Sequence, residues 1–167
     1  VVKSSDKFEG LKRVLDVEEG FRGVIFCRTR IKTQQLADDL NKSGYQSEAL
    51  HGDLSQAQRD RVMKRFKDHS LQVLVATDVA ARGIDVNDLT HVIHYALPDD
   101  PSYYTHRSGR TARAGKKGIS LSLLTNRDMR KLDGLERSLK LKIQKISIPS
   151  VEDILNIRLN KWAQNIL

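Results

Sequence analysis

Short apolar runs alternate along the chain with longer segments in which apolar residues recur at helical spacing. The runs predict strands at 23–27, 45–50, 71–77, 90–97 and 118–124. The run at 71–77 is almost continuously apolar, which is typical of a strand buried on both faces of a sheet. The run at 45–50 is the weakest of the set because polar residues interrupt it.

The amphipathic segments predict helices at 8–20, 31–44, 54–69 and 125–138. Gly44 stands where the second of these helices should stop, since glycine is a common C-terminal cap. Ser55 is placed to cap the third, and Thr125 or Asn126 to cap the fourth. The caps therefore agree with the apolar pattern on where the helices begin and end.

Strands that alternate with helices of this length predict an α/β fold with right-handed crossovers and a parallel sheet covered on both faces. Ligands gather at the carboxyl ends of the strands in such sheets. The tail predicts a last strand at 142–149, and then a helix that begins at Ser150 or Val151 and runs through Trp162. We therefore expect one domain over residues 1–148, followed at 149–167 by a helical extension.

Charge narrows the choice of partner. The 167 residues contain 29 Lys and Arg against 21 Asp and Glu, giving a net charge of +8 and a pI of about 9.7. This excess favours a polyanion such as nucleic acid. The single cysteine, Cys27, excludes an internal disulfide and suits the reducing cytoplasm. No apolar run is long enough to span a membrane, and the chain, which begins at Val1, is expected to be part of a longer one.

The densest positive charge lies in HRSGRTARAGKKG, residues 106–118, between two predicted strands. On a helix, Arg107, Arg110 and Arg113 share a face, where their guanidinium groups repel one another unless an anion lies among them. Arginine binds phosphate through two parallel hydrogen bonds and keeps its charge at working pH. Gly109 lets a ligand or another backbone come close. We favour an anion site here over a solvated basic turn.

Two further segments place polar residues at predicted strand ends. In VATDVAARGIDV, Thr77 and Asp78 follow the most apolar strand, and Asp85 is suited to a sugar hydroxyl. In HGDLSQAQR, Gln56 and Arg59 lie one turn apart at a helix start, where backbone N–H groups favour phosphate. Read alone, each segment is also compatible with ordinary caps and ion pairs.

Taken together, FCRTR, HGDLSQAQRD, VATDVAARGID and HRSGRTARAG resemble, in order and spacing, the second RecA-like domain of DEAD-box RNA helicases. The resemblance covers about residues 7–148. The tail is similar to the segment that follows this core in the bacterial cold-shock or ribosome-assembly members. The fold implied is a three-layer α/β/α domain with a mainly parallel, doubly wound sheet.

The resemblance implies roles in ATP hydrolysis for one group of residues. Arg110 and Arg113 would be arginine fingers that reach the γ-phosphate, and His106 would link them to the partner domain. Gly83 and Asp85 would line the ribose side of the nucleotide. The supporting residues would be Asp78, Arg82 and Arg107, with the last paired to Asp78 or to Asp85.

It also implies a surface that binds the backbone of RNA without reading its bases. The residues concerned are Arg28, Thr29, Gly52, Gln56, Arg59 and Thr77.

The sequence contains neither a G-x-x-x-x-G-K-[ST] phosphate loop nor a D-E-A-D run. In the family these belong to the N-terminal RecA-like domain, which holds ATP and Mg²⁺. We therefore expect this chain alone neither to hydrolyse ATP nor to unwind RNA. Two alternatives remain at this point: a stand-alone RNA- or protein-binding module with the same fold, and the second domain of a DNA helicase.

The remaining notable residues have structural interpretations. Cys27 is expected in the core, Tyr103 and Tyr104 are expected to pack the helix before the fingers, and the histidines at 91 and 94 are not expected to bind metal. An apolar stripe near Trp162 either packs on this domain or is buried in a partner or a homodimer.

Overall fold

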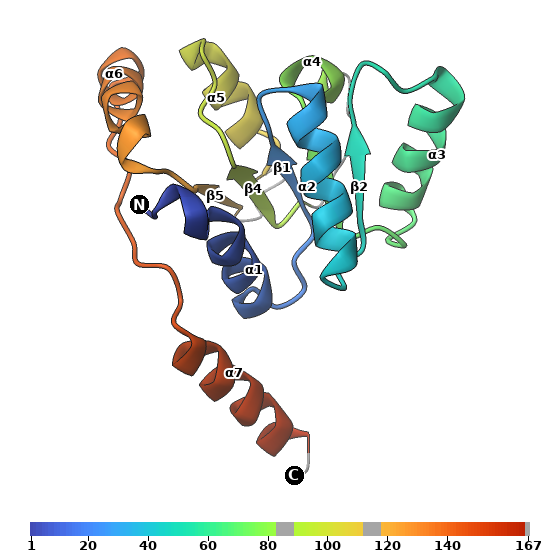
Figure 1. The fold of residues 1–167 in the computed structure, drawn as a ribbon, viewed down its shortest axis with the longest axis vertical. Helices are drawn as coiled ribbons and strands as arrows, with labels where there is room; N and C mark the ends of the chain where they lie inside the picture. The colour runs from blue at the N-terminus through green and yellow to red at the C-terminus, as the bar shows by residue number, and fades with distance from the viewer. Residues whose placement is uncertain (83–88, 112–117, 166–167) are drawn as a thin grey trace.

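Five parallel strands form one sheet in the computed structural model, which describes residues 1–82, 89–111 and 118–165. The strand order is β2-β3-β1-β4-β5 (Figure 1). This order changes direction beside β1, as expected for the doubly wound sheet that the sequence predicts. The strands are β1 Gly23–Phe26, β2 Ser47–Leu50, β3 Val73–Ala76, β4 His91–His94 and β5 Ile119–Ser122.

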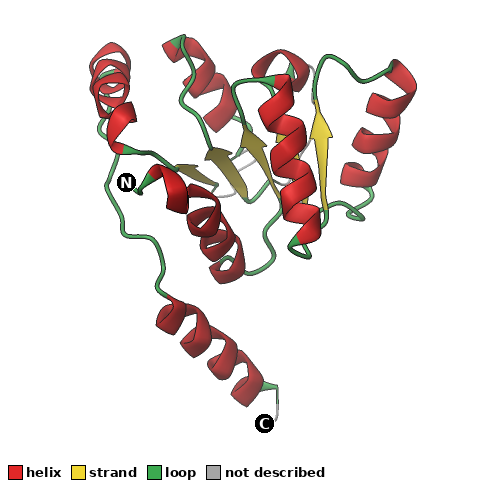
Figure 2. Ribbon diagram, in the orientation of Figure 1, coloured by secondary structure: helices red, strands yellow, loops and turns green. Residues whose placement is uncertain are grey.

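Helices cover both faces of the sheet and complete the three layers (Figure 2). Leu11 of α1 and Leu40 of α2 pack with Ile25 on one face, whereas Phe66 of α3 and Ala80 of α4 pack with Val24 on the other. The alternation along β1 places successive side chains in opposite cores. The helices are α1 Lys7–Val17, α2 Arg30–Lys42, α3 Gln56–Lys67, α4 Asp78–Ala81, α5 Pro101–Ser108, α6 Met129–Leu139 and α7 Val151–Gln164, with short 3-10 turns at Ser4–Asp6 and Asn126–Asp128.

The predicted caps are confirmed. The Ser55 hydroxyl accepts a hydrogen bond from the Gln58 backbone N–H at 3.2 Å, and the Gln58 side chain accepts one from the Ser55 N–H at 2.8 Å. Thr125 begins the next helical segment, where its backbone N–H and its hydroxyl both donate to the Asp128 carboxylate, at 2.8 and 2.9 Å. Gly44 has φ = +93° immediately after α2, a conformation that glycine adopts without steric cost.

The predicted strand at 142–149 is wrong, because the structure shows no regular element anywhere in that segment. The Ile143 N–H donates to the Glu136 side chain at 2.7 Å instead of to a neighbouring strand. Ile148 packs beside α1, whereas Ile146 stays 59% exposed. The apolar alternation that indicated a strand thus comes from a connecting segment that has too few buried partners to hold it in a sheet.

Helix α7 begins at the predicted Ser150 cap and lies apart from the sheet, beyond α1 (Figure 1). Ile154 is buried, and Arg158 forms an ion pair with Asp16 of α1 at 3.4 Å. Trp162, by contrast, is 68% exposed. One face of α7 therefore packs on the domain, and the stripe near Trp162 faces outward. No helix in the described part of the chain is long and apolar enough to cross a membrane.

Candidate functional site

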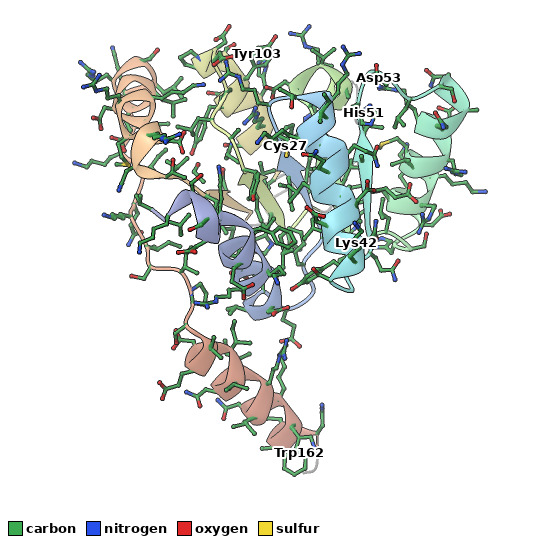
Figure 3. The ribbon with its side chains drawn as sticks, viewed as in Figure 1. Cys27, Lys42, His51, Asp53, Tyr103 and Trp162 are labelled. Carbon is green, nitrogen blue, oxygen red and sulfur yellow. The ribbon has the colours of Figure 1, made fainter. Side chains whose placement is uncertain are left out.

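The carboxyl ends of the strands bring together polar segments that are far apart in sequence. His51, Asp53 and Tyr103 lie along the upper edge in Figure 3, whereas Lys42 and Trp162 lie well below it. β1, β2 and β3 are parallel and in register, so the residues that follow them meet at this edge. All six predicted RNA-contacting residues follow one of these strands or lie in the first turn of α3.

Thr29 and Thr77 each cap the helix that follows their strand. The Thr29 hydroxyl accepts a hydrogen bond from the Lys32 N–H at 3.2 Å, and the Thr77 hydroxyl accepts one from the Ala80 N–H at 3.4 Å. Thr77 is 8% exposed. Each hydroxyl can still donate its own proton, because a threonine hydroxyl is both donor and acceptor.

Two arginines at this edge are held by groups of the same domain. The Arg59 guanidinium donates to the Ala80 carbonyl at 3.2 Å, which ties the start of α3 to the short helix α4. Arg28 pairs with Asp99 at 3.2 Å, and the same carboxylate contacts Lys131 of α6 at 2.6 Å. Lys131 thereby offsets the negative charge of Asp99 beside Arg28.

The loop between β2 and α3 is fixed by His51, whose anchoring role the sequence interpretation missed. Its Nδ1 accepts the Asp53 N–H at 3.3 Å, so its Nε2 carries the proton and donates to the Gln34 side chain at 2.9 Å. The Asp53 carboxylate in turn pairs with Arg30. These contacts fix the backbone around Gly52, which lies beside Arg30.

Arg107, in the arginine-rich segment at 106–118, is buried, with 2% of its surface exposed. Its guanidinium is held by several contacts. Its Nε and Nη2 donate to the two oxygens of Asp78 at 2.5 and 2.7 Å, and its Nη1 donates to the Ala96 carbonyl at 2.7 Å. The guanidinium also lies 4.8 Å from the Phe26 ring centroid, a cation–π distance. Of the two partners predicted for Arg107, the structure shows Asp78.

The shared helical face predicted for Arg107 and Arg110 is wrong, and Arg113, the third predicted member, lies outside the described residues. α5 ends at Ser108, and Gly109 and Arg110 form a turn in which the Arg110 N–H donates to the Arg107 carbonyl at 3.2 Å. A Cβ at Gly109 would lie 3.1 Å from the Thr105 carbonyl of the preceding helical turn, so the expected approach of a ligand or another backbone stays a prediction. The Arg107 guanidinium points inward to the Asp78 carboxylate and does not lie beside Arg110 on a common helical face.

A small pocket opens beside this clamp. It is lined by Phe26, Asp78, Ala81, Arg82, Tyr103, His106, Arg107 and Arg110. The Arg82 guanidinium lies 5.3 Å from the Tyr103 ring centroid and donates to its hydroxyl. His106 meets the same ring edge-on, with centroids 6.5 Å apart. The lining therefore contains three arginines, Arg82, Arg107 and Arg110, and one carboxylate, that of Asp78.

The family model described as the helicase conserved C-terminal domain matches residues 6–115. This chain belongs to that family. Its relatives and structural neighbours show that it is the C-terminal, RecA-like domain of the DEAD-box type.

Curated relatives of the helicase domain include two bacterial proteins named DEAD-box ATP-dependent RNA helicase CshA. That of Bacillus cereus (strain ATCC 10987 / NRS 248) is 44% identical over 154 residues, which cover 92% of this chain and 29% of the relative. That of Bacillus subtilis (strain 168) is 41% identical over 154 residues, which cover 92% of this chain and 31% of the relative. The chain thus spans under a third of the length of either protein.

Solved structures share the fold. A DEAD box protein from Methanococcus jannaschii aligns with a TM-score of 0.83 at 48% identity, covering 87% of this chain and 40% of that one. E. coli SrmB bound to the regulator of ribonuclease activity A gives 0.79 at 33% identity, with 92% and 89% coverage. S. cerevisiae Dbp5 bound to RNA and ADP BeF3 gives 0.80 at 30% identity, with 95% and 42% coverage.

Three predicted site residues of the helicase domain, Gly83, Asp85 and Arg113, lie outside the residues that the structure describes. The described ranges hold no group of three or more His, Cys, Asp or Glu side chains that could bind a metal ion. Cys27 is buried, and burial raises the pKa of its thiol to about 12, as suits a core residue.

Proposed function

We propose that this domain is the second RecA-like half of an ATP-dependent RNA helicase and lends Arg110 to an ATP molecule that another domain holds. The observation that supports the proposal is the position of Arg110, which lies in a turn anchored to the buried Arg107–Asp78 pair and lines a pocket at the carboxyl edge of the sheet. A cation anchored in this way stabilises charge that develops on a transferring phosphoryl group.

The pocket suits a nucleotide phosphate. Arg82, Arg110 and His106 line it, and the carboxylate of Asp78 is already matched by Arg107. His106 would carry the contact from this pocket to the first domain. By the family resemblance, Arg113 would be a second finger, and Gly83 and Asp85 would lie near the ribose.

Mg²⁺ is assigned to the N-terminal RecA-like domain. The sequence here has no phosphate loop or D-E-A-D run to place a metal beside the triphosphate. When bound there, Mg²⁺ would neutralise charge on the β- and γ-phosphates. The described residues of this chain would contribute arginine charge to the same reaction.

RNA would lie over the carboxyl ends of β1, β2 and β3. The residues proposed to contact it are the six that the sequence predicts: Arg28, Thr29, Gly52, Gln56, Arg59 and Thr77. Threonine hydroxyls, a glycine backbone and arginines suit the phosphate and sugar, contacts that position a strand without reading its sequence. Specificity for a particular RNA would then arise outside this surface.

Replacing Arg59 with alanine in the intact helicase is expected to weaken RNA binding by a similar factor for every sequence tested. Loss of one phosphate contact should reduce the slope of log K against log salt by about 0.7 for single-stranded RNA. Arg61→Ala is the matched control, because Arg61 is an exposed arginine of the same helix. Fluorescence anisotropy over a salt series measures both quantities, and an unchanged slope for Arg59→Ala would contradict the RNA surface.

We also propose that α7 pairs with α7 of a second copy. Four apolar residues recur along it at helical spacing and are all more than half exposed: Val151, Leu155, Leu159 and Trp162. The face with Ile154 and Arg158 is already against α1, so the described residues leave this stripe open for a second copy. One continuous apolar stripe is self-complementary when two copies of a helix meet.

The double variant Leu159→Ser/Trp162→Ser is expected to be monomeric where the unmodified chain is dimeric. Size-exclusion chromatography with light scattering measures the mass, and a chain truncated at Pro149 gives the monomer reference. Equal monomeric masses for all three at high concentration would rule out the homodimer.

A further inference from the structure

His94, at the end of β4, is buried and has no part in the roles assigned above. Its ring stacks on Tyr104 of α5 with centroids 4.5 Å apart, and the Phe26 ring lies on a roughly parallel plane at 6.4 Å. Every heteroatom of the ring has a polar partner. Nδ1 faces Nη1 of Arg107 at 3.3 Å, and Nε2 faces the hydroxyls of Ser120 at 3.1 Å and Ser108 at 3.3 Å.

The partners fix the protonation of this ring. A guanidinium only donates, so Nδ1 of His94 accepts from Arg107 and the proton lies on Nε2, which donates to the two serines. Burial, followed by the positive charge of Arg107, lowers the pKa of His94 to about 3. The ring is therefore neutral at physiological pH and presents a lone pair to the arginine.

These contacts connect His94 to the turn that contains Arg110. Arg107 is held by Asp78 on one side of its guanidinium, and by the Ala96 carbonyl and His94 on the other. The carbonyl of Arg107 accepts the backbone N–H of Arg110. Ser108, the last residue of α5, accepts from His94, and its carbonyl accepts the Thr111 N–H at 3.2 Å and hydroxyl at 2.9 Å. Both residues that anchor the turn of Arg110 are thus bound to one imidazole.

We propose that His94 is a positioning residue for phosphoryl transfer: it orients Arg107 and the end of α5, and through them sets the position of Arg110. The inference rests on the proposed role of Arg110. This gives β4 a function beyond packing. A ring of the same shape that lacked an acceptor at the Nδ1 position would still fill the space, but it would leave the Arg107 guanidinium less constrained.

Three variants of the intact helicase separate these contacts. Asparagine places its amide near Nδ1 and retains the acceptor for Arg107, glutamine places its amide near Nε2 and loses that acceptor, and leucine loses both. His94→Gln and His94→Leu are expected to lower kcat for RNA-stimulated ATP hydrolysis about 10- to 100-fold, the scale of a small misplacement of a catalytic group. His94→Asn should recover most of that loss, and KM for ATP should change little in all three.

Comparing Arg110→Ala with His94→Gln distinguishes failure of the positioning role of His94 from failure of the proposed function. If Arg110→Ala abolishes hydrolysis and His94→Gln folds with unchanged kcat, the positioning role is wrong and the finger stands. If Arg110→Ala also retains hydrolysis, the proposed function itself fails. Circular dichroism melting shows which variants fold. Where the glutamine or leucine variant does not, Ser108→Ala/Ser120→Ala removes the hydrogen-bond acceptors of Nε2 and should lower kcat in the same direction.

A second measurement on the unmodified chain needs no activity. Long-range ¹H–¹⁵N spectra distinguish the two neutral tautomers and the imidazolium. The expected spectrum shows the Nε2–H form of His94 with no titration above pH 5. An Nδ1–H tautomer, or an imidazolium at pH 6, would overturn the inference, because neither presents a lone pair to Arg107.

Discussion

Arg110→Ala in the intact helicase is expected to lower kcat for ATP hydrolysis about 10³-fold or more, the scale of arginine fingers in other phosphoryl-transfer enzymes. Arg110 lies in a turn whose backbone is tied to Arg107, and it lines the positively charged pocket. A finger acts mainly on charge that develops in the transition state, so kcat and kcat/KM should fall together. Steady-state hydrolysis with saturating RNA measures both.

Two companion variants sharpen that experiment. Arg110→Lys keeps the charge but loses the planar pair of donors, and we expect it to restore only a small part of the rate. Arg130→Ala, an exposed arginine of α6 that does not line the pocket, should be near normal. If Arg110→Ala kept more than about a tenth of the normal kcat, Arg110 would not be a finger of the expected strength.

Asp78→Ala is expected to destabilise the domain by about 3 kcal/mol, because it leaves the buried guanidinium of Arg107 without its carboxylate. Arg107 is 2% exposed, whereas the Asp78 side chain is 22% exposed. Water can therefore compensate part of the loss, which places the effect at the low end of the range for broken buried pairs. Urea unfolding of the isolated chain measures the free energy of unfolding.

The double variant Asp78→Ala/Arg107→Met tests the cause of that loss. Removing the buried charge as well as its partner should return part of the stability, since apolar residues of similar volume often replace buried pairs at little cost. Asp133→Ala, an exposed carboxylate of α6, is the matched control and should change stability by less than about 0.5 kcal/mol. A single Asp78→Ala variant as stable as that control would contradict the clamp.

The predictions that were confirmed depend on local chemistry. The run at 71–77 contains β3, and Ser55 begins α3, because a strand period and a capping hydroxyl are written in neighbouring residues. Parallel pairing then brings Thr29 and Thr77 to one edge without any need to know the side-chain contacts. That is why the sequence places these residues correctly at the ends of the strands; their contact with RNA stays a prediction.

The predictions that failed depend on contacts between distant residues. Helix periodicity could not show that Arg107 turns inward to Asp78, 29 positions earlier in the chain; only the family resemblance named that carboxylate, as one of two partners. The spacing of Arg107 and Arg110 indicates a shared face, but α5 ends between them. His94 is inconspicuous in sequence for the same reason. The only available signal was a histidine in an otherwise apolar strand, next to a segment rich in arginine.

The most direct test of the central claim compares ATP hydrolysis by the isolated chain with hydrolysis by the intact helicase under saturating RNA. The account predicts no hydrolysis above background for the chain alone, because its arginines require a triphosphate held by another domain, and full RNA-stimulated hydrolysis for the intact protein. RNA-stimulated hydrolysis by the isolated chain, lost on Arg110→Ala, would contradict it.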